Sequence, residues 1–369
     1  MVKVFVLNNY PFEEVWEQVS RGEKPDHHLY GINHFHQRGY NVEIVPFQSI
    51  KPLFWFSNYL SQHFPIPVGH LDHQWSTLRR LAQADLIYAP CQTESHSLSY
   101  LRAMGLIETP IVCIAHHPLN RGRLSPLRQP FIKLWVQGTD AFPALSVKLS
   151  DSINQLVGDP LKSIPLSWGP DPRYYPSMSS VGHGVVAAGR TGRDFVTFGL
   201  AASQSTSSAH IICLESAVTP VFQSFSSRVQ ITVRPDRSPM AYPELIEAYT
   251  QARVIAIPMY AGSSLCGLTS LTDALALGKP VIMTRNQLID IDIEAEGIGV
   301  WVEPNDIEGW KRAIQFFEDH ETEALVMGQR ARRLMETKFN SDIFANQVMD
   351  IFDAALMPAQ KKEPIKIST

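Results

Sequence analysis

The chain has 369 residues, of which 44% are hydrophobic and 18% charged, and its formal net charge at pH 7 is −4. This length favours two domains, the composition is that of an ordinary soluble protein, and the small negative charge excludes a general attraction to nucleic acid. No apolar run reaches the roughly 18 residues that a membrane-spanning helix needs, and the first residues read as a strand rather than a signal peptide. We therefore expect a cytoplasmic protein that binds no nucleic acid.

The first half alternates short apolar runs with helical patterns, which is typical of βαβ units and a parallel sheet. The expected strands are Lys3–Leu7, Asn41–Pro46, Leu86–Ala89, Pro110–Ala115 and Leu134–Gln137, and the expected helices are His28–Arg38 and Trp75–Ala82. The four cysteines have neither CxxC nor metal-ligand spacing, and we expect free thiols.

A segment rich in proline and glycine follows at residues 164–177, with four prolines and one glycine. It predicts an interdomain linker. We therefore divide the chain into an N-terminal domain over 1–165 and a C-terminal domain over 166–340. Residues 341–369 then form a tail and a final helix that can cross back to the N-terminal domain.

The second half repeats the same alternation, and two such halves predict an α/β fold made of two Rossmann-like domains. The expected strands are Gly184–Ala188, His210–Glu215, Val229–Arg234, Arg253–Pro258, Pro280–Thr284 and Gly299–Val302. The expected helices are Tyr242–Thr250, Thr269–Leu277, Ile307–His320, Glu323–Lys338 and Asp342–Ala355.

The strongest local signal is a Gly/Ser-rich loop that begins at Gly262, enters a helix near Gly267 and leads through Gly278 into a strand. A helix start presents free N–H groups and the positive end of its dipole, so it is a natural anion site. Gly267 lets an anion such as a diphosphate approach the backbone. The alternative is that Gly267 only shapes a turn and Ser270 only caps the helix.

A second signal is Val185-Val-Ala-Ala-Gly-Arg-Thr-Gly-Arg-Asp-Phe195, in which a strand ends in a glycine-broken loop with two arginines. At the carboxyl end of a strand, Arg190 and Arg193 suit phosphate oxygens, since guanidinium groups bind them with charge-assisted hydrogen bonds. The alternative is a surface ion pair between Arg193 and Asp194 or Glu215.

Taken in order, these segments and Val302-Glu-Pro-Asn-Asp306 resemble the nucleotide-sugar domain of the family 4 retaining glycosyltransferases of GT-B fold. Ile164-Pro-Leu-Ser-Trp-Gly-Pro-Asp171 resembles the "IP-x-GVD" crossover of that family, and the resemblance spans about residues 160–357. It implies a GT-B fold with two Rossmann-like domains and transfer of a sugar from a nucleotide diphosphate, most simply UDP.

The resemblance assigns the donor diphosphate to five residues, namely Arg190, Arg193, Gly267, Leu268 and Thr269. Arg190 is also assigned a catalytic role, and Arg193 stands where the family more often has lysine.

Asp273 takes the place of the ribose-binding glutamate of the family, and Leu265 replaces the glutamate that contacts the transferred sugar. Ser263 and Ser264 are candidates to replace part of that hydrogen bonding.

The first half resembles the family in architecture and at one strand end. The resemblance makes His116 and His117 candidate catalytic residues, and the alternative is that they only cap the strand. His28 and Tyr30 are candidate acceptor contacts, and the alternative is exposed residues at a helix start.

Two segments of the first half suggest a contact with a membrane or a lipid acceptor. Between Pro110 and Thr139 there is no acidic residue, whereas Arg121, Arg123, Arg128 and Lys133 alternate with apolar residues, and four aromatic residues group within 52–59. A basic, partly apolar patch of this kind can rest on the inner face of a membrane, although such segments are also often solvated loops.

The pattern Asp290-Ile-Asp292 resembles a metal-binding DxD motif, but it lies in a different architecture, so we expect no required metal. Neither a G-x-G-x-x-G nor a Walker A sequence is present, so we expect no cofactor. The sequence thus predicts a metal-independent, hexosyltransferase-like enzyme with an unidentified acceptor. Two alternatives remain, a nucleotide-sugar 2-epimerase of the same fold and a non-catalytic nucleotide-sugar-binding protein.

Overall fold

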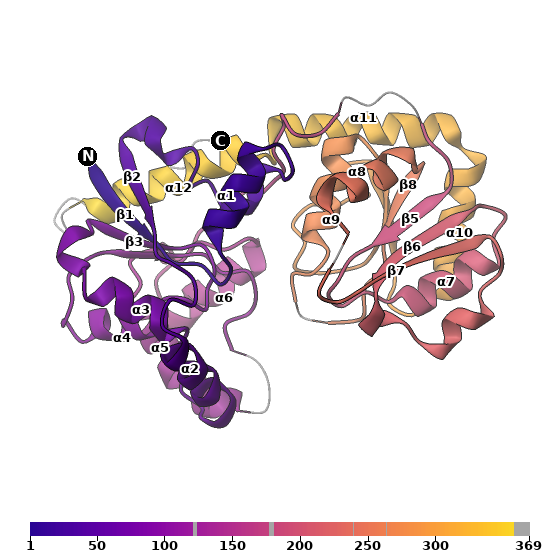
Figure 1. Ribbon diagram of the computed structural model, residues 1–369. Coiled ribbons are helices and arrows are strands. Elements are labelled where there is room, and N and C mark those ends of the chain that lie inside the picture. Colours follow the sequence, from indigo (N-terminus) through magenta and orange to yellow (C-terminus); the bar gives the residue numbers. More distant parts are fainter. Residues whose placement is uncertain (121–123, 177–180, 239, 263, 358–369) are drawn as a thin grey trace. The chain divides into compact units, whose positions relative to one another are not determined.

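The computed structural model describes residues 1–120, 124–176, 181–238, 240–262 and 264–357, which form two compact units (Figure 1). The first unit comprises Met1–Arg21, Asp26–Trp168 and the described residues from Ser341 on. The second comprises Gly22–Pro25 and Gly169–Asn340. The short segment Gly22–Pro25 therefore belongs to the unit that holds the second half of the chain.

The first unit is built on a parallel sheet in the order β2-β1-β3-β4. Its strands are β1 (Val2–Val6), β2 (Tyr40–Ile44), β3 (Leu86–Ala89) and β4 (Ile111–Cys113). Alternate residues face opposite sides of a strand. Ile87 accordingly packs with Leu98 on one face, and Tyr88 meets the ring of Phe352 on the other, with ring centroids 5.1 Å apart.

Helices cover both faces of this sheet, with α12 on one face and α4 on the other (Figure 1). The helices are α1 (Phe12–Ser20), α2 (Lys51–His63), α3 (Leu71–Leu78), α4 (His96–Ala103), α5 (Ser125–Gln137), α6 (Val147–Val157) and α12 (Ser341–Leu356). Short 3-10 turns lie at Asp26–Leu29, Phe35–Arg38 and Leu81–Gln83. The helix α12 is thus part of the first unit although it ends the described chain.

Two expected elements of the first half are wrong. The helix predicted over His28–Arg38 is two 3-10 turns, because Tyr30 and Gly31 both have positive φ, 48° and 84°, which an α-helix does not accommodate. The strand predicted over Leu134–Gln137 is the last turn of α5, whose buried residues Ile132, Trp135 and Val136 have helical spacing.

The second unit is a six-stranded parallel sheet in the order β10-β9-β8-β5-β6-β7. Its strands are β5 (Val185–Ala188), β6 (Ala209–Leu214), β7 (Val229–Arg234), β8 (Val254–Ile257), β9 (Val281–Thr284) and β10 (Gly299–Val302). Its helices are α7 (Phe195–Ser203), α8 (Tyr242–Gln251), α9 (Leu268–Leu277), α10 (Ile307–Asp319) and α11 (Glu321–Thr337), with 3-10 turns at Glu215–Ala217 and Pro220–Ser224. The strands expected for this half are confirmed, and α7 was not expected.

The helices α7 and α10 lie on one face of the second sheet, and α8 and α9 on the other (Figure 1). On the first of these faces Phe198 and Trp310 are fully buried, with ring centroids 5.4 Å apart, in a core that also includes Val185 and Val254. This core fixes β5 and the loop that follows it, where the two predicted phosphate-binding arginines lie.

All four cysteines are free thiols, as expected. Among the described residues, no helix is both long and apolar enough to cross a bilayer.

Candidate functional site

The Gly/Ser-rich loop of the second unit leads into α9 as expected, and Gly267 is its N-cap residue with φ 90°. Within the described residues, no side chain caps this helix start. The first N–H groups of an α-helix have no partner within the helix, so those of Leu268, Thr269 and Ser270 are left for another acceptor. The start of α9 therefore has the donors of an anion site.

Position 267 has no room for a side chain. A Cβ there would lie 2.9 Å from Met283 Cε and 3.0 Å from Ile257 Cγ2, and φ 90° is a conformation that residues other than glycine rarely adopt. The beginning of α9 is thus set directly against the ends of β8 and β9.

Arg193 reaches this helix start from the loop after β5. Its Nη2 donates to Ser270 Oγ at 2.9 Å, and its Nε donates to the Ala188 carbonyl at 3.1 Å. Within the described residues it has no ion pair with Asp194 or Glu215, and Asp194 instead caps α7 by accepting from Thr197 N. Burial lowers the pKa of Arg193 from its ordinary value. The guanidinium is therefore a partly buried cation that lies beside α9 without a carboxylate.

Gly189 makes this arrangement possible. A Cβ at this glycine, whose φ is 148°, would lie 2.3 Å from Nε of Arg193. The Gly-Arg pattern in the sequence thus has a steric reason, because the glycine leaves the space that the later arginine fills.

Arg190 is exposed and, within the described residues, has no ion pair. Burial of Lys24 and, less strongly, the charge of Arg190 lower the pKa of Lys24. The two cations therefore lie close enough to interact. Lys24 is in the short segment that joins the second unit, where the Tyr174 hydroxyl also donates to the Glu23 carbonyl at 3.4 Å. No local sequence pattern points to Lys24, because only the tertiary fold brings it near Arg190.

Asp273 lies one turn into α9 and is almost fully buried. Its Oδ1 accepts from the hydroxyl of Tyr175 at 2.6 Å and also from the hydroxyl of Tyr242. Burial raises the pKa of Asp273 to about 6, although both tyrosine hydrogen bonds act in the opposite direction. The carboxylate thus has two phenol partners of its own, and its predicted ribose contact stays a prediction.

Leu265, which stands where the family that the sequence resembles has a glutamate, is buried. Beside it Ser264 Oγ lies 3.1 Å from Cys266 Sγ, and the Ser264 carbonyl accepts from Asn286 Nδ2 at 3.0 Å. Ser263 lies outside the described residues. The loop is therefore tied to the strand β9 side of the sheet by its backbone.

In the first unit, His116 and His117 follow β4 and are held by one side chain. The Oε1 of Gln92 accepts from the backbone N–H of both, at 2.7 and 2.8 Å. The Nε2 of His116 donates to the Pro90 carbonyl at 2.5 Å, and burial lowers the pKa of His116 to about 4. His116 is therefore a neutral imidazole, and its Nδ1 has no hydrogen-bond partner among the described residues.

Tyr30 and His116, predicted from distant segments, are brought together with ring centroids 5.2 Å apart. Tyr30 also stacks on Trp168 at 6.2 Å and is not the exposed residue that the alternative interpretation expected. Its φ of 48° is unusual for an aromatic residue, and such strain often occurs at functional sites. His28 lies in the preceding turn, where its carbonyl accepts from the Tyr10 hydroxyl at 2.6 Å.

The remaining sequence candidates have ordinary surroundings or lie outside the described residues. Asp292 Oδ1 accepts from the N–H of Glu294 and from Trp301 Nε1, which is a surface turn. The described residues contain no group of three or more His, Cys, Asp or Glu side chains that could hold a metal ion. Arg121 and Arg123 are not among the described residues, so the membrane contact stays a prediction.

With two parallel-sheet α/β domains, the protein has the GT-B fold of glycosyltransferases. Residues 238–334 match the model of the family described as "Glycosyl transferases group 1", a segment that contains α9 and the loop before it. No curated protein matches the chain.

Several solved structures share this fold. Alr3699/HepE of Anabaena, solved in complex with UDP-glucose, superposes with a TM-score of 0.64 at 16% identity, covering 96% of this chain and 100% of that one. Sucrose-phosphate synthase from Thermosynechococcus elongatus gives a TM-score of 0.68 at 12% identity over 96% and 98% of the two chains. The α,α-trehalose 6-phosphate synthase of Burkholderia multivorans gives 0.63 at 11% identity, again over 96% and 98%.

Proposed function

We propose that the protein is a metal-independent glycosyltransferase that moves a hexose from a UDP-sugar to an acceptor with retention of configuration, as in family 4. The observation that carries the proposal is the Arg193 guanidinium at the uncapped start of α9. A partly buried cation beside unpaired N–H groups suits a diphosphate better than any neutral ligand. The group 1 family match and the UDP-glucose complex of the Anabaena protein support this choice of donor.

The proposed donor site consists of Arg190, Arg193 and the backbone of Gly267, Leu268 and Thr269. Lys24 adds a third cation on the side of Arg190. When the bond between the sugar C1 and the phosphate oxygen breaks, both electrons go to the diphosphate. Groups that are already in place then stabilise its growing negative charge more than they stabilise the bound substrate, which lowers the barrier.

In the proposed retaining reaction, the acceptor oxygen bonds to C1 from the face that the diphosphate leaves. The acceptor proton passes to the departing phosphate oxygen, so no carboxylate base is required. The first unit is proposed to hold the acceptor, with His116 and His117 at the carboxyl end of β4. Tyr30 lies against His116, and His28 lies in the 3-10 turn that precedes Tyr30. In open α/β sheets this edge is where ligands bind.

One observation favours a second candidate function. Leu265 is a buried apolar residue where the family has its sugar-contacting glutamate, so the chain can be a protein that binds a nucleotide sugar without transferring it. Incubation of the full chain with UDP-glucose, followed by chromatography of the products, separates the possibilities. A transferase releases UDP, an epimerase yields a different UDP-sugar, and a binding protein leaves the donor unchanged while being stabilised by it. Absence of both turnover and donor binding would contradict the proposal.

A further inference from the structure

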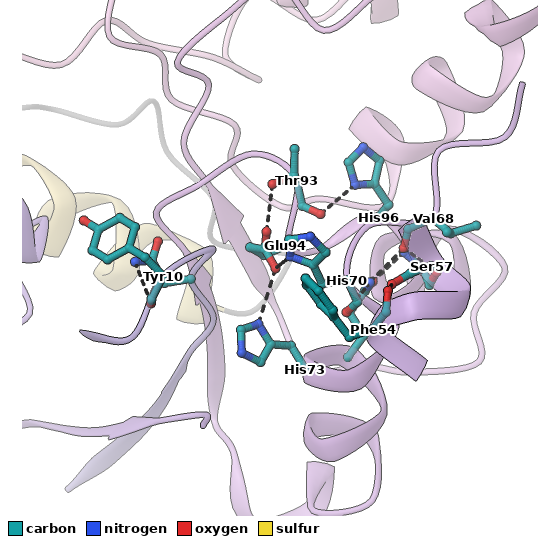
Figure 2. Close-up of polar contacts among 12 residues, drawn as sticks. Tyr10, Phe54, Ser57, Val68, His70, His73, Thr93, Glu94 and His96 are labelled. Carbon is teal, nitrogen blue, oxygen red and sulfur yellow. Dashed lines mark hydrogen bonds and ion pairs between the residues drawn. The ribbon is translucent and has the colours of Figure 1, made fainter. Parts of the chain in front are cut away.

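The loop after β3 in the first unit holds a buried carboxylate that none of the proposed chemistry uses. Glu94 Oε2 accepts from Nδ1 of His70 at 2.9 Å and lies 3.3 Å from Nδ1 of His73, and Oε1 accepts from the Thr93 hydroxyl at 2.7 Å (Figure 2). Burial alone would raise the pKa of Glu94, but the hydrogen bonds from the two histidines outweigh it and lower the pKa to about 2. Glu94 is therefore an ionised group inside the protein.

Of this group, His70 is the member that reaches the surface. The side chains of Glu94 and His73 are 0% and 1% exposed, whereas that of His70 is 22% exposed. Because the Glu94 carboxylate can only accept, it holds the proton of His70 on Nδ1 and leaves Nε2 as the outward acceptor of the neutral ring. Within the described residues, Nε2 has no hydrogen-bond partner, and the rings of Phe54 and Phe47 lie 5.1 and 6.5 Å from the imidazole.

The backbone is built to bring His70 to this position. Gly69 has φ 67°, and a Cβ there would lie 2.3 Å from the Thr93 carbonyl oxygen and 3.1 Å from His96 Nδ1. Next to it, Gln74 donates to the His70 carbonyl at 3.1 Å. Position 69 therefore requires glycine, because any side chain there would collide with the loop that carries Glu94. A chance ion pair on the surface would not need this close packing.

The position also lies at the edge of the sheet where ligands bind. Phe47 follows β2, Glu94 follows β3, and the same loop carries Gln92, which holds the N–H groups of His116 and His117 after β4. The carboxyl ends of parallel strands form one edge. His70 is thus linked, through Glu94 and the loop that Glu94 shares with Gln92, to the histidines that are proposed to face the acceptor.

We propose that His70 is an acceptor-binding residue, whose Nε2 accepts a hydrogen bond from a sugar hydroxyl while the sugar ring lies against Phe54. Sites for small molecules combine apolar surface with a few fixed polar groups, and here an aromatic ring lies beside an oriented imidazole. Glu94 is a positioning residue that fixes the ring and its tautomer. The proposal rests on the proposed glycosyl transfer and names its acceptor class as a carbohydrate.

The pH dependence follows from the groups around the ring. Burial lowers the pKa of His70, but Glu94 and, less strongly, Asp72 outweigh it, so the net shift is upward. His73 shares the carboxylate, and His96, whose pKa burial lowers to about 4, stays neutral. The acceptor form of His70 is the neutral one, so sugar binding should weaken as the pH falls through its pKa. Removing the charge of Glu94 should move this loss to lower pH.

The test is a titration of the full chain with glucose as the probe, followed through the histidine ring signals in NMR spectra. We expect glucose to shift the His70 signal, and His70→Gln to weaken glucose binding about tenfold, the loss of one hydrogen bond. The matched control is His63→Gln, which removes an exposed histidine of α2 whose Nδ1 donates to the Tyr59 carbonyl. Glu94→Gln should keep binding at high pH and lower the pH at which it is lost.

Each result decides the question. Two results would overturn the proposal: a His70 signal that does not shift when glucose is added, or equal glucose affinity in His70→Gln and the wild type. The first result is measured on the wild-type protein and does not depend on whether a variant folds. UDP binding is measured on the same samples. Normal UDP binding with no response of His70 rejects the acceptor site and leaves the proposed function standing, whereas a response of His70 without UDP binding rejects the proposed function instead.

Discussion

Substitution of Gly267 by alanine tests the geometry of the proposed donor site most sharply. At φ 90° an L-residue is strained by roughly 1–2 kcal/mol. The added methyl group would also lie 3.0 Å from Ile257 Cγ2, on a strand that cannot move freely, and such overpacking costs roughly 1–3 kcal/mol. We expect Gly267→Ala to lower the free energy of unfolding of the second unit by about 2–5 kcal/mol.

The same change should displace the first N–H groups of α9 and reduce UDP affinity by about tenfold or more, the loss of at least one charge-assisted hydrogen bond. Urea unfolding and calorimetry with UDP measure the two effects. Gly262→Ala is the matched control, because it lies in the same loop and its nearest neighbour would be the Tyr260 carbonyl oxygen at 3.9 Å. Equal stability and equal UDP affinity in the two variants would show that Gly267 is not required at the start of α9.

Arg190→Ala should slow donor turnover by roughly ten- to a hundredfold, because it removes one charge-assisted hydrogen bond to the diphosphate. A wild-type rate in steady-state kinetics would contradict this role. Its control is Arg312→Ala, which removes a guanidinium that is 72% exposed and 3.7 Å from Asp306. Lys24→Ala should weaken UDP binding less than Arg190→Ala, and an effect that persists unchanged at 1 M salt would argue against an electrostatic contribution. Asp273 binds its proton more tightly in the folded than in the unfolded chain, because its pKa is raised from 3.8 to about 6. The free energy of unfolding of the second unit should therefore fall by roughly 3 kcal/mol as the pH rises from 4 to 6 and Asp273 ionises. In urea unfolding, Asp273→Asn should not show this decline in stability. If the stability of the variant and the wild type changed with pH in parallel, Asp273 would not be its cause.

The elements that the sequence predicts best are the strands of the second unit. Runs such as Val254–Ile257 are wholly buried, lie in a parallel sheet and are bounded by residues that end strands, so their apolar pattern is unambiguous. The apolar run Leu134–Gln137 is equally short but belongs to a helix, since a short apolar run does not distinguish a strand from one buried helical face.

The residues of the candidate site also differ in how well the sequence predicts them. Gly267 and Arg193 can be recognised because the chemistry of a helix start and of a Gly-Arg loop is local in sequence. Lys24 cannot, since its neighbour Arg190 is distant in the chain. The contact of Glu94 with His70 and His73 is also missed, because a lone buried glutamate and two histidines of α3 and its N-cap have no local pattern that joins them.

The proposed donor site requires that a diphosphate binds where Arg193 meets the start of α9. A crystal structure of the full chain with UDP tests it most directly. We expect pyrophosphate oxygens within about 3 Å of the N–H groups of Leu268 and Thr269 and of the Arg193 guanidinium. UDP bound elsewhere, with Arg193 still donating to Ser270 and the start of α9 empty, would contradict it.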